Sequence, residues 1–192
     1  MNRNIIFTIS LLFMLSMSSK GLTSNLEEGA VAPDFELSVI NIDGTQTESF
    51  KLSDFRGKQP VYLVFWNTWC GYCIKKTPKL RAMQEKFGDK IKIIGINTSK
   101  SDSVSESLVF QKKYAINYDL AFDYGETVTD LYDVWGTPTE FIVDINGVIQ
   151  FRDGVPDDIG NYLSEWSSLS LNETAALSKQ GKNKLSETVT GE

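Results

Sequence analysis

The 192-residue sequence predicts an α/β fold whose sheet is parallel in its first part and antiparallel at its end. Continuous apolar runs at residues 61–66 and 91–96 are typical of strands that are buried on both faces of a sheet. A segment with helical spacing follows each run. Near the C-terminus, Asn146-Gly147 separates two further apolar runs, which is the strongest short signal for a hairpin. Together these patterns predict an α/β sandwich with a mixed sheet.

The elements can be placed in chain order from their periodicity and from the residues that bound them. The helix at residues 72–87 has Leu80, Met83 and Phe87 on one face and ends before Gly88, a common helix terminator. A stretch rich in Ser and Asp precedes the second helix. We expect strands at residues 35–42, 61–66, 91–96, 120–122, 140–143 and 148–152, a turn at Asp43-Gly44, and helices at residues 72–87, 103–114, 127–134 and 158–166.

The N-terminus has the layout of a secretory signal peptide, with cleavage after Ser18 or Ser19. Arg3 supplies a positive charge, and the apolar run that follows is short for a membrane span of about 20 residues. An uncleaved N-terminal anchor is the alternative. The mature protein would work in the periplasm or elsewhere outside the cytoplasm. We therefore expect a targeting segment at residues 1–19, one domain at residues 31–171 and a disordered tail at residues 172–192.

The composition excludes several classes of function. Hydrophobic residues make up 41% and charged residues 23% of the chain, which is the balance of a globular protein. A net charge of −6 without a basic run argues against binding to nucleic acid and to an anionic membrane surface. The absence of histidine excludes hydrolases of the Ser-His-Asp and Cys-His types.

The only two cysteines of the chain, Cys70 and Cys73, lie three positions apart. Structural zinc usually needs four Cys or His ligands, so we expect neither a metal nor a cofactor. A disulfide across two intervening residues closes almost no loop and is therefore a poor structural staple. Redox chemistry is the third interpretation, and the surrounding sequence favours it.

A buried strand, a short turn and a helix in succession put Cys70 at a helix N-terminus. The unpaired N–H groups there favour an anion, and the thiolate is the form of cysteine that attacks disulfides. Cys73 lies one turn further along, and we expect it to be more buried and to attack second. Lys75 and Lys76 add positive charge nearby. We expect three tryptophans around the site, mainly as packing: Trp66, Trp69 and Trp135. For Trp69, which immediately precedes Cys70, the alternative is an apolar rim presented to unfolded substrates.

The segment FWNTWCGYC at residues 65–73 resembles the active site of thioredoxin-fold proteins, and the wider chain resembles the extracytoplasmic TlpA/ResA-like branch of thiol-disulfide oxidoreductases. This resemblance implies a thioredoxin-like three-layer α/β/α sandwich with a mixed central sheet. It also implies that Pro138 is cis and that the backbone of Thr137 pairs with an extended substrate. The other matching segments are Pro78, APDFEL at residues 32–37 and GTPTEFIVDINGVI at residues 136–149.

The same resemblance implies an enzyme that reduces protein disulfides. In this interpretation the Cys70 thiolate attacks the target disulfide and Cys73 releases the reduced target. The implied partners are protein thiols and disulfides, with apocytochrome c as one candidate client and a membrane thiol reductase as the electron donor; we expect a monomer. The residues expected to contact the substrate are Trp69, Gly71, Tyr72, Thr137 and Pro138.

Three alternative functions stay open. A disulfide isomerase or oxidase would also fit Gly71-Tyr72, but such isomerases carry a separate dimerisation region, which we do not expect in this chain. A peroxiredoxin-type peroxidase needs Thr or Ser three residues before the reactive cysteine and Pro seven before, where this chain has Asn67 and Leu63. A binding module without turnover is disfavoured by the intact pair of cysteines.

Two positions depart from the family pattern. Relatives carry a carboxylate that handles the thiol proton at one or the other of these positions, and this chain has no carboxylate at either. The two positions hold Val64, six residues before the first cysteine, and Lys76, three residues after the second. Glu140 is the candidate replacement, since it interrupts an apolar strand and shares a face with Pro138. A carboxylate on that face would suit the removal of a thiol proton. The alternative is that Glu140 forms an ion pair with a lysine such as Lys76.

Overall fold

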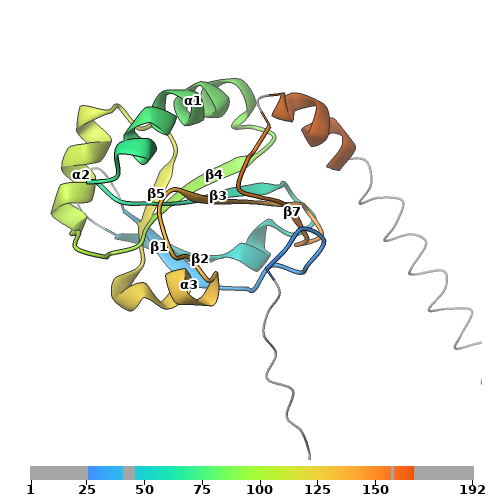
Figure 1. Ribbon diagram of the computed structural model, residues 1–192. Coiled ribbons are helices and arrows are strands. Elements are labelled where there is room, and N and C mark those ends of the chain that lie inside the picture. Colours follow the sequence, from blue (N-terminus) through green and yellow to red (C-terminus); the bar gives the residue numbers. More distant parts are fainter. Residues whose placement is uncertain (1–25, 41–45, 157, 167–192) are drawn as a thin grey trace, which may run out of the picture.

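The computed structural model describes residues 26–40, 46–156 and 158–166, which form a seven-stranded mixed sheet between two layers of helices (Figure 1). This is the α/β/α arrangement that the sequence predicts. The strands are β1 (Glu36–Ile40), β2 (Gln46–Lys51), β3 (Val61–Trp66), β4 (Lys92–Asn97), β5 (Asp119–Phe122), β6 (Thr139–Val143) and β7 (Ile149–Arg152). The helices are α1 (Gly71–Phe87), α2 (Val104–Lys113), α3 (Thr127–Leu131), the 3-10 turns η1 (Leu52–Phe55) and η2 (Tyr124–Glu126), and a helical segment at residues 159–166.

Strand β3 lies inside the sheet and positions the site. The strand order is β2-β1-β5-β4-β3-β6-β7. Strands β3, β4 and β5 run parallel, whereas β6 pairs with β3 in the antiparallel direction. The C-terminal ends of the three parallel strands therefore lie at one edge of the sheet, and β6 starts at that same edge.

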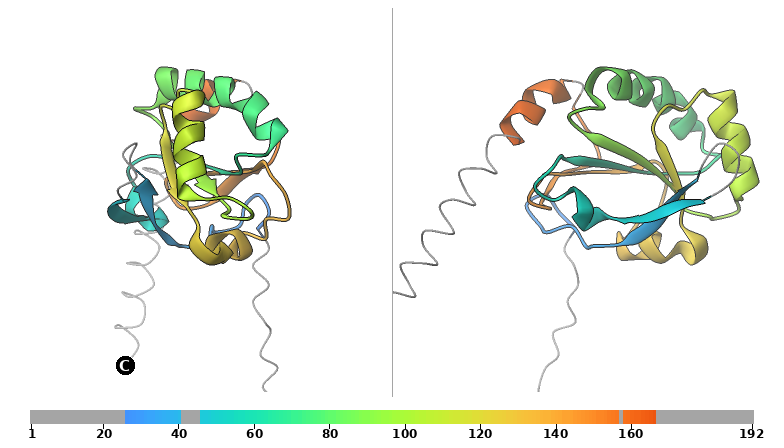
Figure 2. Two further views of the ribbon diagram at one scale, coloured as in Figure 1. Left: turned by 90° about the vertical axis from the view of Figure 1, so that its left-hand side faces the viewer. Right: turned by 180° about the vertical axis from the view of Figure 1, so that it is seen from behind.

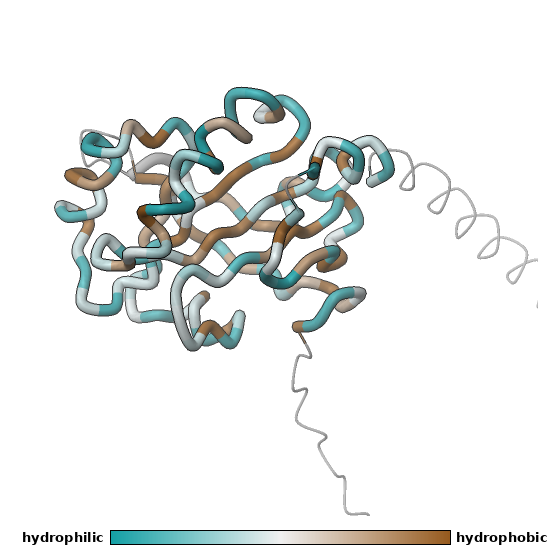
Figure 3. The backbone as a smooth tube through the Cα atoms, turned by 45° about the horizontal axis from the view of Figure 1, so that its top comes forward, coloured by the Kyte–Doolittle hydropathy of each residue, from teal (hydrophilic) through white to brown (hydrophobic). Residues whose placement is uncertain are grey.

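Alternation along β3 divides the core into two clusters. Because successive side chains point to opposite faces, the even-numbered residues of β3 pack beneath α1 and the odd-numbered residues lie on the other face. Figure 2 shows α1 and α2 on one side of the sheet and α3 on the other, and Figure 3 shows hydrophobic segments along the strands between them. The α1-side cluster includes Trp66, Cys70, Cys73, Leu80 and Ile142, and the α3-side cluster includes Leu63, Phe65, Val128, Tyr132 and Phe141.

Helix α1 has the sequence features that predict it. Leu80 and Met83 are buried, as their spacing indicates. Gly88 follows the last residue of the helix in a right-handed conformation, so its role is not to supply a positive φ. A Cβ at Gly88 would lie 2.3 Å from Nε2 of Gln84 and 2.6 Å from the carbonyl oxygen of the same residue. Close approach of the last helical turn therefore explains the glycine.

The polar segment at residues 46–55 differs from the prediction, because β2 and η1 form where the sequence indicates no regular element. Strand β2, with the sequence QTESFK, is an edge strand that pairs only with β1. An edge strand needs no continuous apolar run, so its sequence lacks the pattern that identifies β3 and β4. The predicted helix at residues 127–134 also ends earlier, at Leu131.

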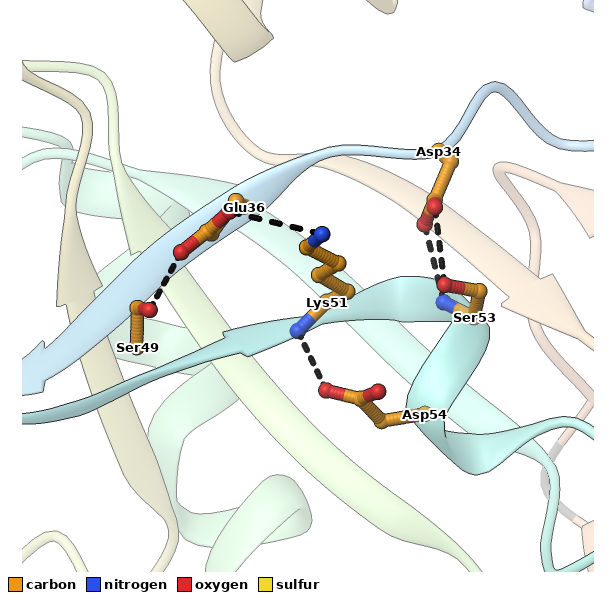
Figure 4. Close-up of polar contacts among 6 residues, drawn as sticks. All are labelled: Asp34, Glu36, Ser49, Lys51, Ser53 and Asp54. Carbon is orange, nitrogen blue, oxygen red and sulfur yellow. Dashed lines mark hydrogen bonds and ion pairs between the residues drawn. The ribbon is translucent and has the colours of Figure 1, made fainter.

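Polar contacts join β1, β2 and η1 (Figure 4). Asp34 accepts hydrogen bonds from the backbone N–H and the hydroxyl of Ser53, both at 2.8 Å. Glu36 accepts a hydrogen bond from Ser49 and lies 3.8 Å from the ammonium of Lys51. Burial raises the pKa of Asp34, but the hydrogen bonds from Ser53 outweigh it and hold the pKa of this carboxyl below its usual value.

Three predictions fall outside the described residues: the targeting segment at residues 1–19, the turn at Asp43-Gly44 and the tail at residues 172–192. Within the residues that the structure covers, no helix combines the length and the apolar character that crossing a membrane requires.

Replacing Asp34 with Ala should lower the free energy of unfolding by about 1–2 kcal/mol at neutral pH, because two hydrogen bonds to Ser53 are lost. The native pKa of Asp34 lies below that of an unfolded aspartate, so its contribution is present above about pH 4 and is lost as the pH falls through the native pKa. Urea unfolding of wild type and variant at pH 7 and pH 3 measures the free energy that Asp34 contributes at each pH. A difference in unfolding free energy between wild type and Asp34→Ala that stays constant with pH would contradict the role given to the Asp34 carboxylate. Ser49→Ala is the control in the same hairpin.

Candidate active site

Cys70 and Cys73 form a disulfide at the start of α1, as the sequence pattern indicates. Cys70 is the N-cap residue, and its sulfur accepts a hydrogen bond from the backbone N–H of Cys73 at 3.1 Å. The sulfur takes the place of the side-chain oxygen that usually caps a helix. In the reduced protein, the N–H groups and dipole of α1 would stabilise a thiolate at this atom.

The two cysteines are equally buried, so the expectation that Cys73 is the more buried one is wrong. Each is 5% exposed. The reason is the loop that precedes β6: the carbonyl oxygen of Thr137 lies 3.3 Å from Sγ of Cys70 and covers it. The carbonyl group of Thr137 is therefore one of the groups that shield Cys70 from solvent.

The peptide bond between Thr137 and Pro138 is cis, as the family resemblance implies. Pro138 lines the same small cavity as Cys73, so the two residues of this peptide bond face the two sulfurs. The loop leads directly into β6, whose first residue pairs with Phe65 of β3. Strand pairing therefore brings the loop to the edge of the sheet where α1 begins.

Asn67 joins three loops beneath the disulfide. It follows β3 directly and is buried. Its amide group donates to Oγ1 of Thr98 at 2.8 Å and to the carbonyl oxygen of Lys100 at 3.4 Å. Its side-chain oxygen accepts from the hydroxyls of Thr98 at 3.0 Å and Thr137 at 3.3 Å. Asn67 thus fixes the cis-proline loop relative to the turn that leads into Cys70.

Asp102 holds the same turn through the loop that follows β4. Its carboxylate accepts from the backbone N–H and the hydroxyl of Thr68, both at 2.7 Å, and from the amide of Asn97 at 2.8 Å. Beside it, the indole N–H of Trp69 donates to the carbonyl oxygen of Lys100 at 3.1 Å. These contacts fix the backbone just before the reactive sulfur.

Glu140 is 3% exposed on β6, where it pairs in register with Val64 of β3. Its carboxylate accepts hydrogen bonds from the hydroxyl of Tyr62 and from the ammonium of Lys76. The lysine pairing that the sequence leaves as an alternative is therefore present. Burial and the charge of Glu140 raise the pKa of Tyr62 far above its usual value, so Tyr62 remains a donor.

A cavity of about 10 Å³ lies behind Cys73, which is enough space for roughly one water molecule. Lys76 is the only charged residue among the described residues that line it. The indole of Trp66 also lines the cavity, and its buried N–H has no hydrogen-bond partner in the described part of the chain. Lys76 is thus the charged residue that borders the space behind Cys73, and its ammonium pairs with Glu140.

The three tryptophans differ in their surroundings. Trp66 is buried and packs on Phe110, with the ring centroids 4.7 Å apart, as expected. Trp69 and Trp135 are 58% and 88% exposed, so packing is the wrong expectation for these two. Trp69 lies in a turn and Trp135 in a loop, both outside the helices and strands of the described residues.

The dipeptide between the cysteines lies at the surface. Gly71 is exposed, and Tyr72 is 74% exposed with the ammonium of Lys75 5.4 Å from its ring centre. Since Lys76 pairs with Glu140, the two lysines expected to add charge near Cys70 both have other partners.

Sequence reasoning missed Asn67, Asp102 and Tyr62 as members of the site. A signal for Asn67 exists, because a polar residue directly after a fully buried strand must find hydrogen bonds. Asp102 and Tyr62 gave no such signal, since the partners of Asp102 depend on how the loops meet and the partner of Tyr62 depends on the pairing of β3 with β6. In the described residues, no group of three or more Cys, Asp or Glu side chains is arranged to bind a metal ion.

Comparison with known proteins agrees with this site. Residues 29–152 match the AhpC/TSA family. The thioredoxin-like protein YneN of Bacillus subtilis strain 168 is 33% identical over 126 residues, which cover 65% of this chain and 70% of YneN. The thiol-disulfide oxidoreductase ResA of the same strain is 32% identical over 126 residues, which cover 65% of this chain and 66% of ResA.

A solved structure shows the same fold. The thioredoxin domain of a thiol-disulfide oxidoreductase from Bacteroides vulgatus has a TM-score of 0.62 and 25% identity, and the match covers 74% of this chain and 99% of that domain. The residues that match the family, 29–152, contain both cysteines and the cis-proline loop. The chain belongs to the AhpC/TSA family and is a thiol-disulfide oxidoreductase.

Proposed function

We propose that this protein works outside the cytoplasm and reduces disulfides in other proteins. One observation carries the proposal: the sulfur of Cys70 caps α1 and faces the carbonyl group of Thr137. An extended client that pairs with the backbone of Thr137 would bring its own sulfur to Cys70. In this arrangement Trp69, Gly71, Tyr72, Thr137 and Pro138 form the surface that the client contacts.

The reaction transfers two electrons to the client in two exchanges. The Cys70 thiolate attacks one sulfur of the client disulfide, which forms a mixed disulfide and releases the first client thiolate. Cys73, once deprotonated, attacks Sγ of Cys70. This step forms the Cys70–Cys73 disulfide that the structure contains and releases the second client thiol.

The remaining parts of the proposal concern location and partners. A secretory signal at residues 1–19, cleaved or kept as an anchor, would take the domain out of the cytoplasm. A membrane thiol reductase would then re-reduce the disulfide, and apocytochrome c is a candidate client. Fractionation of cells that express the full chain, followed by sequencing of its N-terminus, tests the location; recovery in the cytoplasm would contradict it.

Peroxidase activity is not favoured. In place of the residues that a peroxiredoxin requires, Leu63 is buried in the α3-side core and the amide of Asn67 is engaged by Thr98 and Lys100. Oxidase or isomerase activity uses the same two cysteines in the other direction, so the reduction potential distinguishes it from the proposed activity.

Cys73→Ser should trap protein clients as mixed disulfides on Cys70, because the second exchange cannot occur. Multiple-turnover reduction of insulin with dithiothreitol should be lost in the same variant. Non-reducing gels of the expressing cells measure the trapping. Cys70→Ser is the matched control and should trap nothing, and equal trapping by both variants would contradict the assigned order of attack.

The reduction potential of the Cys70–Cys73 couple should lie below that of glutathione, as a reductant requires. Equilibration with reduced and oxidised glutathione, followed by the fluorescence of tryptophans near the site, measures it. A potential well above that of glutathione would instead indicate an oxidase or isomerase.

We further propose that Glu140 assists the resolving step through Lys76. Burying an ammonium is unfavourable without a partner, and Glu140 supplies the partner for Lys76. Lys76 lines the cavity behind Cys73, and a positive charge near that sulfur would stabilise a developing thiolate. Glu140, held in turn by Tyr62, is the residue that positions this charge.

Lys76→Gln should shift the pH profile of mixed-disulfide resolution upward by about one unit and slow resolution at pH 7, since the thiolate of Cys73 loses its cation. Stopped-flow kinetics with a preformed mixed disulfide on Cys70 measures this. A rate that is unchanged or faster would contradict the proposal and leave Glu140 itself as the proton acceptor.

Two further variants separate charge from folding in this experiment. Lys76→Gln with Glu140→Gln removes both charges, so no buried ion is left unpaired, and it should resolve as slowly as the single variant. Asp119→Asn breaks a different ion pair, with Lys92 on the sheet, and should leave the pH profile of mixed-disulfide resolution unchanged.

A further inference from the structure

Trp66 carries a buried polar atom that has no acceptor among the described residues. The side chain is 5% exposed, and its Nε1–H is one of three buried side-chain polar atoms in the described part of the chain that make no hydrogen bond. The indole N–H groups of Trp69 and Trp135, by contrast, donate to Lys100 and Asp133. Buried polar groups in proteins are nearly always paired with a protein group or an ordered water. The N–H of Trp66 therefore needs an acceptor.

The cavity of about 10 Å³ behind Cys73 lies beside this N–H. Trp66, Gly95, Tyr118 and Leu120 all line the cavity. A Cβ atom on Gly95 would lie 3.1 Å from Nε1 of Trp66, and its other nearest neighbours would be side-chain atoms of Leu120 at 2.7 Å and Tyr118 at 3.3 Å. Nε1 therefore belongs to the part of the cavity wall that these residues form.

Gly95 makes this arrangement possible. It lies inside β4, where glycine has no side chain to pack and often marks the close approach of another group. A positive φ is not the reason for the glycine, since Gly95 is not among the glycines that have one. Because any Cβ would collide with Leu120 and crowd the indole N–H, the missing side chain lets Trp66 bring its polar atom to the cavity.

The cavity has the size and the polarity of a site for one water molecule. Polar side chains that line it besides Trp66 belong to Cys73, Lys76, Thr77 and Tyr118. Oγ1 of Thr77 donates to the carbonyl oxygen of Cys73 at 3.0 Å, which leaves its own lone pairs as acceptors. Empty cavities in proteins are apolar, whereas a cavity that holds a water offers it two to four polar partners. The volume is about that of one water-sized probe, so no larger ligand fits.

The titratable groups around the cavity come from four elements. Cys73 and Lys76 belong to α1, and Tyr118 precedes β5. Glu140 of β6 pairs with Lys76, and Tyr62 of β3 donates to Glu140. Burial raises the pKa of Tyr118 far above its usual value, so its hydroxyl stays protonated. The lining residues from β4 and α2 carry no charge, and none of these groups accepts the indole N–H.

We propose that one water molecule binds in this cavity, accepts a hydrogen bond from Nε1–H of Trp66 and donates one to the thiolate of Cys73. This inference rests on the proposed resolving role of Cys73 and adds a hydration site to it. Cys73 is 5% exposed, so bulk solvent supplies little hydrogen bonding to its sulfur. A hydrogen bond to the charged form of a group favours that form, and an ordered water provides nearly as good a bond as a protein group. Trp66 is a positioning residue that acts through the water.

Crystal structures of the reduced wild type and of Trp66→Phe, at a resolution that shows ordered water, test the site itself. In the wild type we expect one water within about 3.2 Å of Nε1 of Trp66. In Trp66→Phe we expect no ordered water at that place, because the donor that holds it is gone. A wild-type cavity without water, or a water that keeps its place in the variant, would overturn the proposal.

The pKa of Cys73 tests the role of the water without any client. In a Cys70→Ser background Cys73 is the only thiol, and the ultraviolet absorbance of its thiolate gives the pKa. Trp66→Phe should raise this pKa by about one unit, since the thiolate loses the hydrogen bond from the water. Gly95→Ala keeps the indole but fills the space beside Nε1, so it should raise the pKa in the same direction.

Trp166→Phe is the matched control. Trp166 is 4% exposed and belongs to the same α1-side cluster as Trp66, but it does not line the cavity. The control should leave the pKa of Cys73 unchanged. An unchanged pKa in Trp66→Phe, or equal shifts in Trp66→Phe and Trp166→Phe, would overturn the inference. Neither result would affect the proposed reductase function, which the reduction of insulin measures separately.

Discussion

The site depends on one sulfur atom that must do two things at once. Sγ of Cys70 caps α1, and it also faces the carbonyl oxygen of Thr137, which is 67 positions away in the chain. The pairing of β3 with β6 brings the two segments to the same edge of the sheet. Asn67 sets the final separation, because its side chain contacts the loops on both sides. A change in the register between β3 and β6, or loss of the Asn67 amide, would separate Sγ of Cys70 from the Thr137 backbone that guides its partner.

The ion pair between Lys76 and Glu140 shows how this chain differs from the family that its cysteine motif resembles. In that pattern a carboxylate lies on the helix, three residues after the second cysteine, whereas here Lys76 occupies the position and the carboxylate of Glu140 lies on the strand. Here the lysine, and not the carboxylate, is the charged residue that lines the cavity behind Cys73. A positive charge near the sulfur favours an anion there, so under our proposal for Lys76 the two arrangements serve the same chemical step by different physical means.

Much of the fold follows from local patterns, and the exceptions have physical causes. The apolar runs of β3 and β4 and the spacing of Leu80 and Met83 predict buried elements because burial requires that composition. Strand β2 could not be predicted, since an edge strand with polar residues needs only a neighbour to pair with.

The site was partly predictable, because some of its features follow from local sequence patterns. The cysteines form a local motif, and the face of Glu140 follows from alternation along its strand. Its contact with Tyr62, and the exposure of Trp69 and Trp135, depend on how distant segments meet. No short window of the sequence contains that information.

The separation of the core by the sheet has a practical consequence for engineering. Both sulfurs belong to the apolar cluster under α1, and none belongs to the cluster on the α3 side. A biosensor built from this scaffold should place its fluorophore on the α1 side, where a change of oxidation state alters the surroundings. Fusion partners and affinity tags are better attached near the β2 edge of the sheet, which lies farther from β3 and the cysteines in the strand order.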